Sequence, residues 1–277
     1  MSFSAILTHV QADASAEPRL RLAADLANQF GAALIGVAAE IFEPPTVTAA
    51  MGYVDGGTLV AEATAVEGDL SRAETLFDDI AKAVTAGSSF RCGVGLPGEL
   101  MAQQARTADL IVCAARHPDR WGLHNHADAG DLLMDAGRPV MVVPDTLAKL
   151  DASSVLIAWK DTRESRRAVA DAMPFLERAK QVLIAAVCEE REETVARASV
   201  ADVAEFLARH GVKASTAVRE PGKGSATAAL RQIAQMQDAG LIVAGGYGHA
   251  RIREWVFGGV TRELLHGDGK AAVFLSH

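Results

Sequence analysis

The sequence predicts an α/β protein made of two tandem domains, each with a doubly wound, five-stranded parallel sheet. Three observations predict this fold. Short apolar runs alternate with amphipathic stretches, the same order of segments occurs twice in 277 residues, and the runs are apolar throughout rather than at every second residue. Continuously apolar strands are typical of sheets with helices on both faces, and alternating strands and helices form parallel βαβ units. Right-handed crossovers then give doubly wound sheets.

The first half contains four apolar runs and a weaker one that we expect to be strands. These strands are expected at Ala5–Val10, Ala33–Ala39, Asp109–Ala114 and Pro139–Val143, with one more short strand before Asp109. Residues Arg19–Phe30 and Ser71–Ala86 have the spacing of amphipathic helices. The segment Phe42–Thr64 is rich in Pro, Gly and small residues, and we expect it to be a loop.

The second half repeats the pattern of the first. Strands are expected at Val155–Lys160, Val182–Cys188, Gly240–Gly245 and Ala271–Leu275, and helices at Arg166–Ala179 and Thr194–His210. The offset between the halves is 150 residues at the first strand (155 − 5) and 131 at the fourth (241 − 110). The first half therefore carries the extra residues, mostly in Phe42–Thr64. We expect domains at residues 1–146 and 152–277, joined near Pro144–Ser154.

The last strand of each domain would leave an unpaired edge, so we expect the two last strands to pair around a pseudo-twofold axis. The chain would then be a pseudo-dimer, with further homodimerisation left open.

Its net charge is −8 and no tract of Lys or Arg is present, which argues against nucleic-acid binding. No apolar stretch approaches the ~20 residues that span a membrane. Cys113 and Cys188 lie in apolar runs, which suggests buried thiols in a cytoplasmic protein.

The loop after the fourth strand of the second half is rich in glycine. It reads Gly245-Gly246-Tyr247-Gly248, and Gly258-Gly259-Val260-Thr261 follows at the start of a helix. Glycines allow backbone N–H groups to approach an anion closely, and ligands of doubly wound sheets bind beyond the carboxyl ends of the strands. The loop is therefore a candidate phosphate site. The simpler interpretation is a turn followed by a helix cap, since no Gly-Lys-Ser/Thr follows.

The spacing Gly245-x2-Gly248-x9-Gly258 resembles the G-x2-G-x9-G-(S/T) signature of the universal stress proteins. The duplicated halves and the segment Ala158-Trp159-Lys160-Asp161 are similar to tandem bacterial members of that family. The resemblance implies the adenine nucleotide alpha hydrolase-like fold and a cytoplasmic stress-response protein. It further implies binding of ATP, with Mg²⁺, or of another adenine nucleotide in the second domain. The implied output is regulatory rather than catalytic.

The resemblance also implies which residues hold the nucleotide. They are Ala158, Trp159, Lys160, Asp161, Val187, Gly245, Gly248, His249, Gly258, Gly259, Val260 and Thr261. Two positions depart from the family pattern, because Gly259 stands at the Ser/Thr position and Lys160 at the position of an acidic residue. The loss of one charge-assisted hydrogen bond costs about 1.5–3 kcal/mol. In the first half, Ala115 and the following Arg-His-Pro replace the glycines, so we expect that half to be structural.

Three other interpretations remain open from the sequence. The chain could be an interaction module of the same fold that binds no nucleotide. It could be a metal-dependent enzyme, because His124, His126 and Asp128 have the H-x-H-x-D spacing of imidazole and carboxylate metal ligands. The simpler interpretation of this segment is a polar loop in which Asp128 is a helix N-cap. Trp159 fits a core position as well as an adenine platform. No catalytic residues are identified, since no G-x-S-x-G motif is present, and weak ATP hydrolysis stays open.

Overall fold

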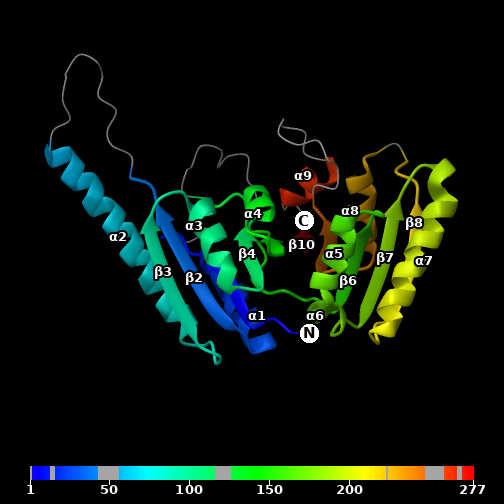
Figure 1. Cartoon of the computed structure of the whole chain (residues 1–277), viewed down its shortest axis with the longest axis horizontal. Helices are drawn as coiled ribbons and strands as arrows, with labels where there is room; N and C mark the ends of the chain where they lie inside the picture. The colour runs from blue at the N-terminus through cyan, green and yellow to red at the C-terminus, as the bar shows by residue number, and fades with distance from the viewer. Residues whose placement is uncertain are drawn as a thin grey trace, which may run out of the picture.

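The computed structural model describes residues 2–12, 16–42, 56–115, 126–222, 224–246, 259–266 and 270–277. Within these residues, ten strands form one continuous sheet in the order β3-β2-β1-β4-β5-β10-β9-β6-β7-β8 (Figure 1). Each half contributes five neighbouring strands in the order of a doubly wound sheet. Neighbouring strands within each half are parallel, whereas β5 and β10 pair antiparallel at the middle.

The first half runs from β1 to β5. Its strands are β1 (Ala5–His9), β2 (Ala33–Glu40), β3 (Ser88–Val94), β4 (Leu110–Ala114) and β5 (Val140–Val143). Its helices are α1 (Ala16–Phe30), α2 (Gly56–Ala81), α3 (Pro97–Gln104) with a 3-10 turn at Ala105–Thr107, and α4 (Ala129–Asp135). The strand order follows the prediction.

The second half repeats this order, with a shorter helix between its second and third strands. Its strands are β6 (Ser154–Trp159), β7 (Gln181–Val187), β8 (Ala214–Arg219), β9 (Leu241–Gly245) and β10 (Ala272–Ser276). Its helices are α5 (Arg163–Asp171), α6 (Met173–Leu176), α7 (Glu193–Arg209) after a 3-10 turn at Glu190–Glu192, α8 (Ala226–Met236) and α9 (Gly259–Leu265). None of the helices in the described ranges is long and apolar enough to cross a membrane.

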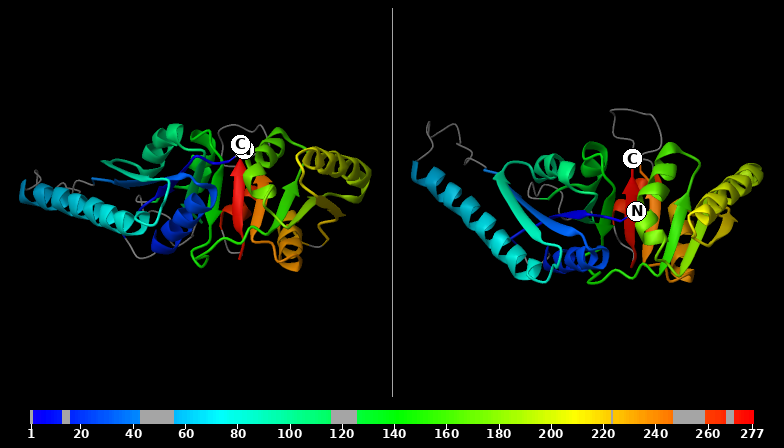
Figure 2. Two further views of the ribbon diagram at one scale, coloured as in Figure 1. Left: turned by 90° about the horizontal axis from the view of Figure 1, so that it is seen from below. Right: turned by 60° about the horizontal axis from the view of Figure 1, so that its bottom comes forward.

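Helices cover both faces of the sheet, which explains why its inner strands are apolar at most positions (Figure 2). Side chains of α1, α2, α5, α6 and α7 form an apolar cluster on one face, and those of α3, α4, α8 and α9 form a second cluster on the other. Successive residues of β6 alternate between the two clusters: Val155, Ile157 and Trp159 belong to the first, and Leu156 and Ala158 to the second. Each cluster extends across both halves of the chain.

The two halves also meet through aromatic rings beneath β5 and β10. The Phe30 ring of α1 lies 5.0 Å from the Phe3 ring and 5.0 Å from the Phe175 ring of α6. Phe274 of β10 continues the contact, with its ring 6.0 Å from that of Phe175. Arg178 lies over the Phe30 ring at 4.3 Å, so a cation–π contact adds to the apolar packing.

Four sequence-based expectations need correction. Helix α2 begins at Gly56, so the predicted loop is wrong for its last nine residues. Most side chains there are exposed, because α2 extends beyond the sheet, and no apolar stripe marks the helix (Figure 1). The helix predicted at Arg166–Ala179 is interrupted at Ala172, before Pro174. Ile6 pairs with Leu110 and Val155 pairs with Leu241, so the offset between the first strands of the two halves is 149 residues (155 − 6) and not 150. Cys188 is only half-buried, whereas Cys113 is buried.

Candidate functional site

Strands β6 and β9 end side by side at the point where the strand order of the second half reverses. Ala158 of β6 pairs with Ala244 of β9. From β6 the chain crosses to β7 on one side, and from β9 to β10 on the other. Such a switch point is the usual ligand position of a doubly wound sheet. The loops that the sequence singled out therefore begin at neighbouring positions.

The turn after β6 carries charged side chains at the surface. Lys160 and Asp161 are both exposed, and Asp161 forms an ion pair with Arg166 of α5. Thr162 caps α5, because its hydroxyl oxygen accepts a hydrogen bond from the Ser165 N–H at 3.3 Å. The short turn thus places the exposed Lys160 ammonium group at the carboxyl end of β6.

Glu164 is a buried carboxylate in the first turn of α5, and its side chain pairs with exposed Arg163. Burial alone would raise the pKa of Glu164. Hydrogen bonds from Arg163, from its own backbone N–H and from Thr162 outweigh burial and hold that pKa below its usual value. The carboxylate is therefore ionised at neutral pH. Sequence reasoning missed this residue, although an acidic residue in a first helical turn is a common signal.

Gly245, the last residue of β9, lies against the backbone of α5. A Cβ atom at this position would lie 2.5 Å from the Ser165 nitrogen and 2.7 Å from the Glu164 carbonyl carbon, well inside van der Waals contact. Gly245 thus allows β9 and α5 to approach closely. The glycine has a packing role that its sequence context did not indicate.

Gly246 lies against the first half of the chain. Its Cβ would lie 2.3 Å from the Cδ2 atom of Leu133 in α4. The Gly246 N–H donates to the Ser276 carbonyl oxygen at 2.8 Å, and His277 Nδ1 lies 3.2 Å from the Gly246 oxygen. The start of the glycine loop is therefore held by β10 and by a helix of the other half.

The remaining predicted residues fall into four groups. Ala158 and Trp159 are buried, and the indole Nε1–H of Trp159 donates to Ser199 Oγ of α7 at 2.8 Å, so this side chain is part of the core. Val187 is half-buried at the end of β7. Gly259, half-buried Val260 and buried Thr261 form the first turn of α9. Gly248, His249, Gly258 and His124 lie outside the described residues.

In the first half, buried polar side chains occupy the corresponding switch point. By strand register Gln11 corresponds to Lys160, yet Gln11 is buried. Buried Arg19 donates from Nη2 to Gln11 Oε1 at 2.9 Å and to the His9 carbonyl oxygen at 3.2 Å. The Gln11 amide nitrogen lies 2.5 Å from His126 Nδ1. This network places hydrogen-bonded side chains of the chain itself after β1.

Two of the three candidate metal ligands have structural contacts. Asp128 caps α4, because its carboxylate accepts hydrogen bonds from the N–H groups of Gly130 at 2.8 Å and Asp131 at 3.2 Å. His126 contacts Gln11. Across the part of the chain that the structure describes, no group of three His, Cys, Asp or Glu side chains could hold a metal ion.

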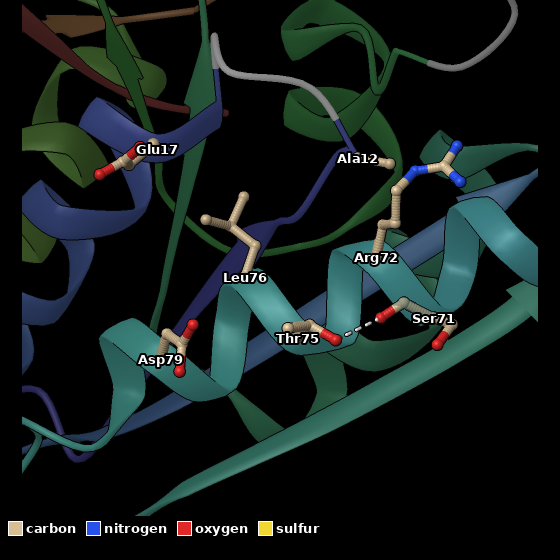
Figure 3. Close-up of a pocket in the computed structure, with 7 residues that line it drawn as sticks. All are labelled: Ala12, Glu17, Ser71, Arg72, Thr75, Leu76 and Asp79. Carbon is tan, nitrogen blue, oxygen red and sulfur yellow. Dashed lines mark hydrogen bonds between the residues drawn. The ribbon is translucent and has the colours of Figure 1, made fainter.

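A surface pocket of about 450 Å³ lies between α1 and α2 in the first half, and Ala12, the residue after Gln11, is part of its lining (Figure 3). It is lined by Ala12, Glu17, Ser71, Arg72, Thr75, Leu76 and Asp79. The lining charges are paired with neighbours: Glu17 with Arg21, Asp79 with Lys82, and Arg72 with Asp69. Leu76 is the apolar side chain between the two helices in this view. The charges that line this pocket are therefore already engaged by neighbouring side chains.

No protein-family model matches the sequence, and no curated protein matches it. Solved structures do match over the whole chain. A universal stress protein from Archaeoglobus fulgidus DSM 4304 is 15% identical, with a TM-score of 0.68, and the match covers 98% of this chain and 97% of that one. The chain has the tandem universal stress protein fold. A putative universal stress protein from Pseudomonas aeruginosa UCBPP-PA14 is 18% identical, with a TM-score of 0.57 over 99% of this chain and 93% of that one.

A functionally unknown protein from Pseudomonas aeruginosa PAO1 has the same arrangement, at 17% identity and a TM-score of 0.56 over 99% of this chain and 92% of that one. At these identities the comparisons establish the universal stress protein fold. They confirm the fold class and the family resemblance predicted from the sequence.

Proposed function

We propose that the second half, residues 152–277, binds an adenine nucleotide such as ATP, with Mg²⁺, at the carboxyl ends of β6 and β9. The observation that carries the proposal is the exposed Lys160 at the switch point of a universal stress protein fold, next to the end of β9 from which the glycine-rich sequence continues. A cation there favours phosphate, and the glycines that follow would allow backbone N–H groups to approach an anion. Gly248, Gly258 and the first turn of α9 complete the proposed site.

The first half, residues 1–146, has the proposed role of a structural partner. Arg19, Gln11 and His126 fill its switch point, so one nucleotide per chain is expected. The proposed output is regulatory, in the cytoplasm, with the bound nucleotide acting as a signal rather than a substrate. Titration should therefore saturate at one nucleotide per chain.

Calorimetric titration with ATP at low salt tests this proposal. Lys160→Glu should weaken binding by up to about thirtyfold, because reversing the charge changes the interaction by two units, each worth about 1 kcal/mol at 4 Å in water. Lys180→Glu is the matched control, since Lys180 is also exposed but precedes β7 at the opposite end of the sheet. It should change the affinity by less than about twofold. No binding by the natural sequence, or equal effects of both substitutions, would reject the site.

A second candidate function is an interaction module that binds no nucleotide. It is favoured by one observation: packing against α5 and Leu133 is enough to explain glycine at positions 245 and 246. Chromatography of the supernatant after acid denaturation of purified protein separates the two functions. Stoichiometric adenine nucleotide in the supernatant excludes the interaction module. Absence of nucleotide there, together with no binding heat in the ATP titration, supports the interaction module.

A further inference from the structure

The contact between Leu133 and Gly246 joins the first half of the chain to the glycine loop of the second. Leu133 is 2% exposed and belongs to the apolar cluster that also contains Leu264 and Leu265 of α9. The side chain approaches so closely that any Cβ at position 246 would overlap its Cδ2 atom. A Cβ at position 246 therefore fits only if the Leu133 side chain moves.

The corresponding position in the first half shows that the glycine is a local requirement. The Ala115 N–H donates to the Val143 carbonyl oxygen at 3.1 Å, as the Gly246 N–H donates to that of Ser276. The offset of 131 residues between Ala115 and Gly246 (246 − 115) equals that between β4 and β9. Backbone geometry at this point of the fold therefore tolerates a methyl group. The close approach of Leu133 is what disfavours a Cβ at position 246.

We propose that Leu133 is a positioning residue that fixes Gly246 and thereby sets the affinity of the nucleotide site in the other half. The effect on affinity rests on the proposed function, whereas the effect on Gly246 does not. Gly246 is held on one side by Ser276 and His277 of the chain end and on the other by Leu133. Removing Leu133 opens one side, so Gly246 samples more conformations and the proposed site that begins there binds phosphate less tightly.

Leu132 provides a matched control for Leu133. It is a leucine in the same helix, 1% exposed and in the same apolar cluster, but it is not among the atoms nearest to Gly246. Both Leu133→Ala and Leu132→Ala create a cavity of similar chemistry. Only Leu133→Ala should release Gly246.

The first test measures amide hydrogen exchange by NMR on the full chain without nucleotide. Leu133→Ala should accelerate exchange of the Gly246 amide by about tenfold or more, while Leu132→Ala leaves it within about twofold of the natural protein. Equal exchange in both variants would overturn the positioning role. This measurement decides the inference even if the protein binds no ATP, in which case the proposed function alone has failed.

The second test measures ATP affinity of the same variants below their melting temperatures. Leu133→Ala should weaken binding by at least about fivefold, the lower range of coupling between distinct sites, and Leu132→Ala by less than about twofold. Gly246→Ala alone should also weaken binding, and its effect should be smaller in the Leu133→Ala background, because the obstructing side chain is gone. Additive effects of Gly246→Ala and Leu133→Ala would contradict the proposal.

Discussion

Gly245→Ala is expected to destabilise the protein by about 2 kcal/mol. The new methyl carbon would lie 2.5 Å from the Ser165 nitrogen, whereas ordinary contact begins at 3.4 Å, so β9 and α5 must separate by about 0.9 Å (3.4 − 2.5). The obstructing atoms are backbone atoms of a helix and cannot rotate away. Overpacking of this kind costs about 1–3 kcal/mol. For a chain of this size, a loss of 2 kcal/mol lowers the melting temperature by about 4–8 °C.

Urea unfolding followed by circular dichroism measures this loss. Gly98→Ala in α3 is the control, because nothing lies within 4 Å of the added methyl, and it should be neutral or stabilising by up to about 1 kcal/mol. Gly246→Ala should cost less than Gly245→Ala, since the obstructing Leu133 is a side chain that can change rotamer. A Gly245→Ala variant as stable as the natural protein would refute the reasoning. The prediction also explains why bulkier residues at position 245 are poor probes of ligand binding.

Two further predictions concern side chains of the core. Trp159→Phe should cost about 0.5–1.5 kcal/mol in urea unfolding through loss of the hydrogen bond to Ser199, and Ser199→Ala in that background should cost much less than in the natural protein. Burial raises the pKa of Cys113 to about 12, with Arg19 opposing the shift. Between about pH 9 and 12 the unfolded chain therefore loses a proton that the folded protein keeps. The contribution of this thiol to the free energy of unfolding should be fully present below about pH 9 and should fall as the pH rises towards 12. A Cys113→Ala variant with the same alkaline pH profile of urea unfolding would contradict this.

The sequence predicts the strands well because buried parallel strands carry a strong local signal. Leu110–Ala114 and Leu241–Gly245 are apolar throughout, and both lie where expected. Helix α2 is harder to predict, because Gly56–Thr64 is mostly exposed and has no apolar stripe. The first turns of this helix follow glycine- and proline-rich sequence, which favours a loop assignment.

Buried polar groups of the switch points are predicted less well. Arg19 shares a helical stripe with Ala23, Leu26 and Phe30, and this spacing could have revealed that the guanidinium group is buried. The packing roles of Gly245 and Gly246 have no comparable signal. They depend on atoms of α5 and α4, which lie about 80 and 110 residues earlier in the chain (245 − 165 and 246 − 133).

The antiparallel pairing of β5 with β10 is made within one polypeptide, so dilution does not separate the partners as it would separate two subunits. Covalent linkage also removes a constraint of symmetric assembly. In a homodimer, any substitution appears on both sides of the axis, whereas here each side can change alone. Ala115 opposite Gly246, and Gln11 opposite Lys160, are differences of this kind. Fusion thus allows the two halves to carry different residues at the same position of the fold.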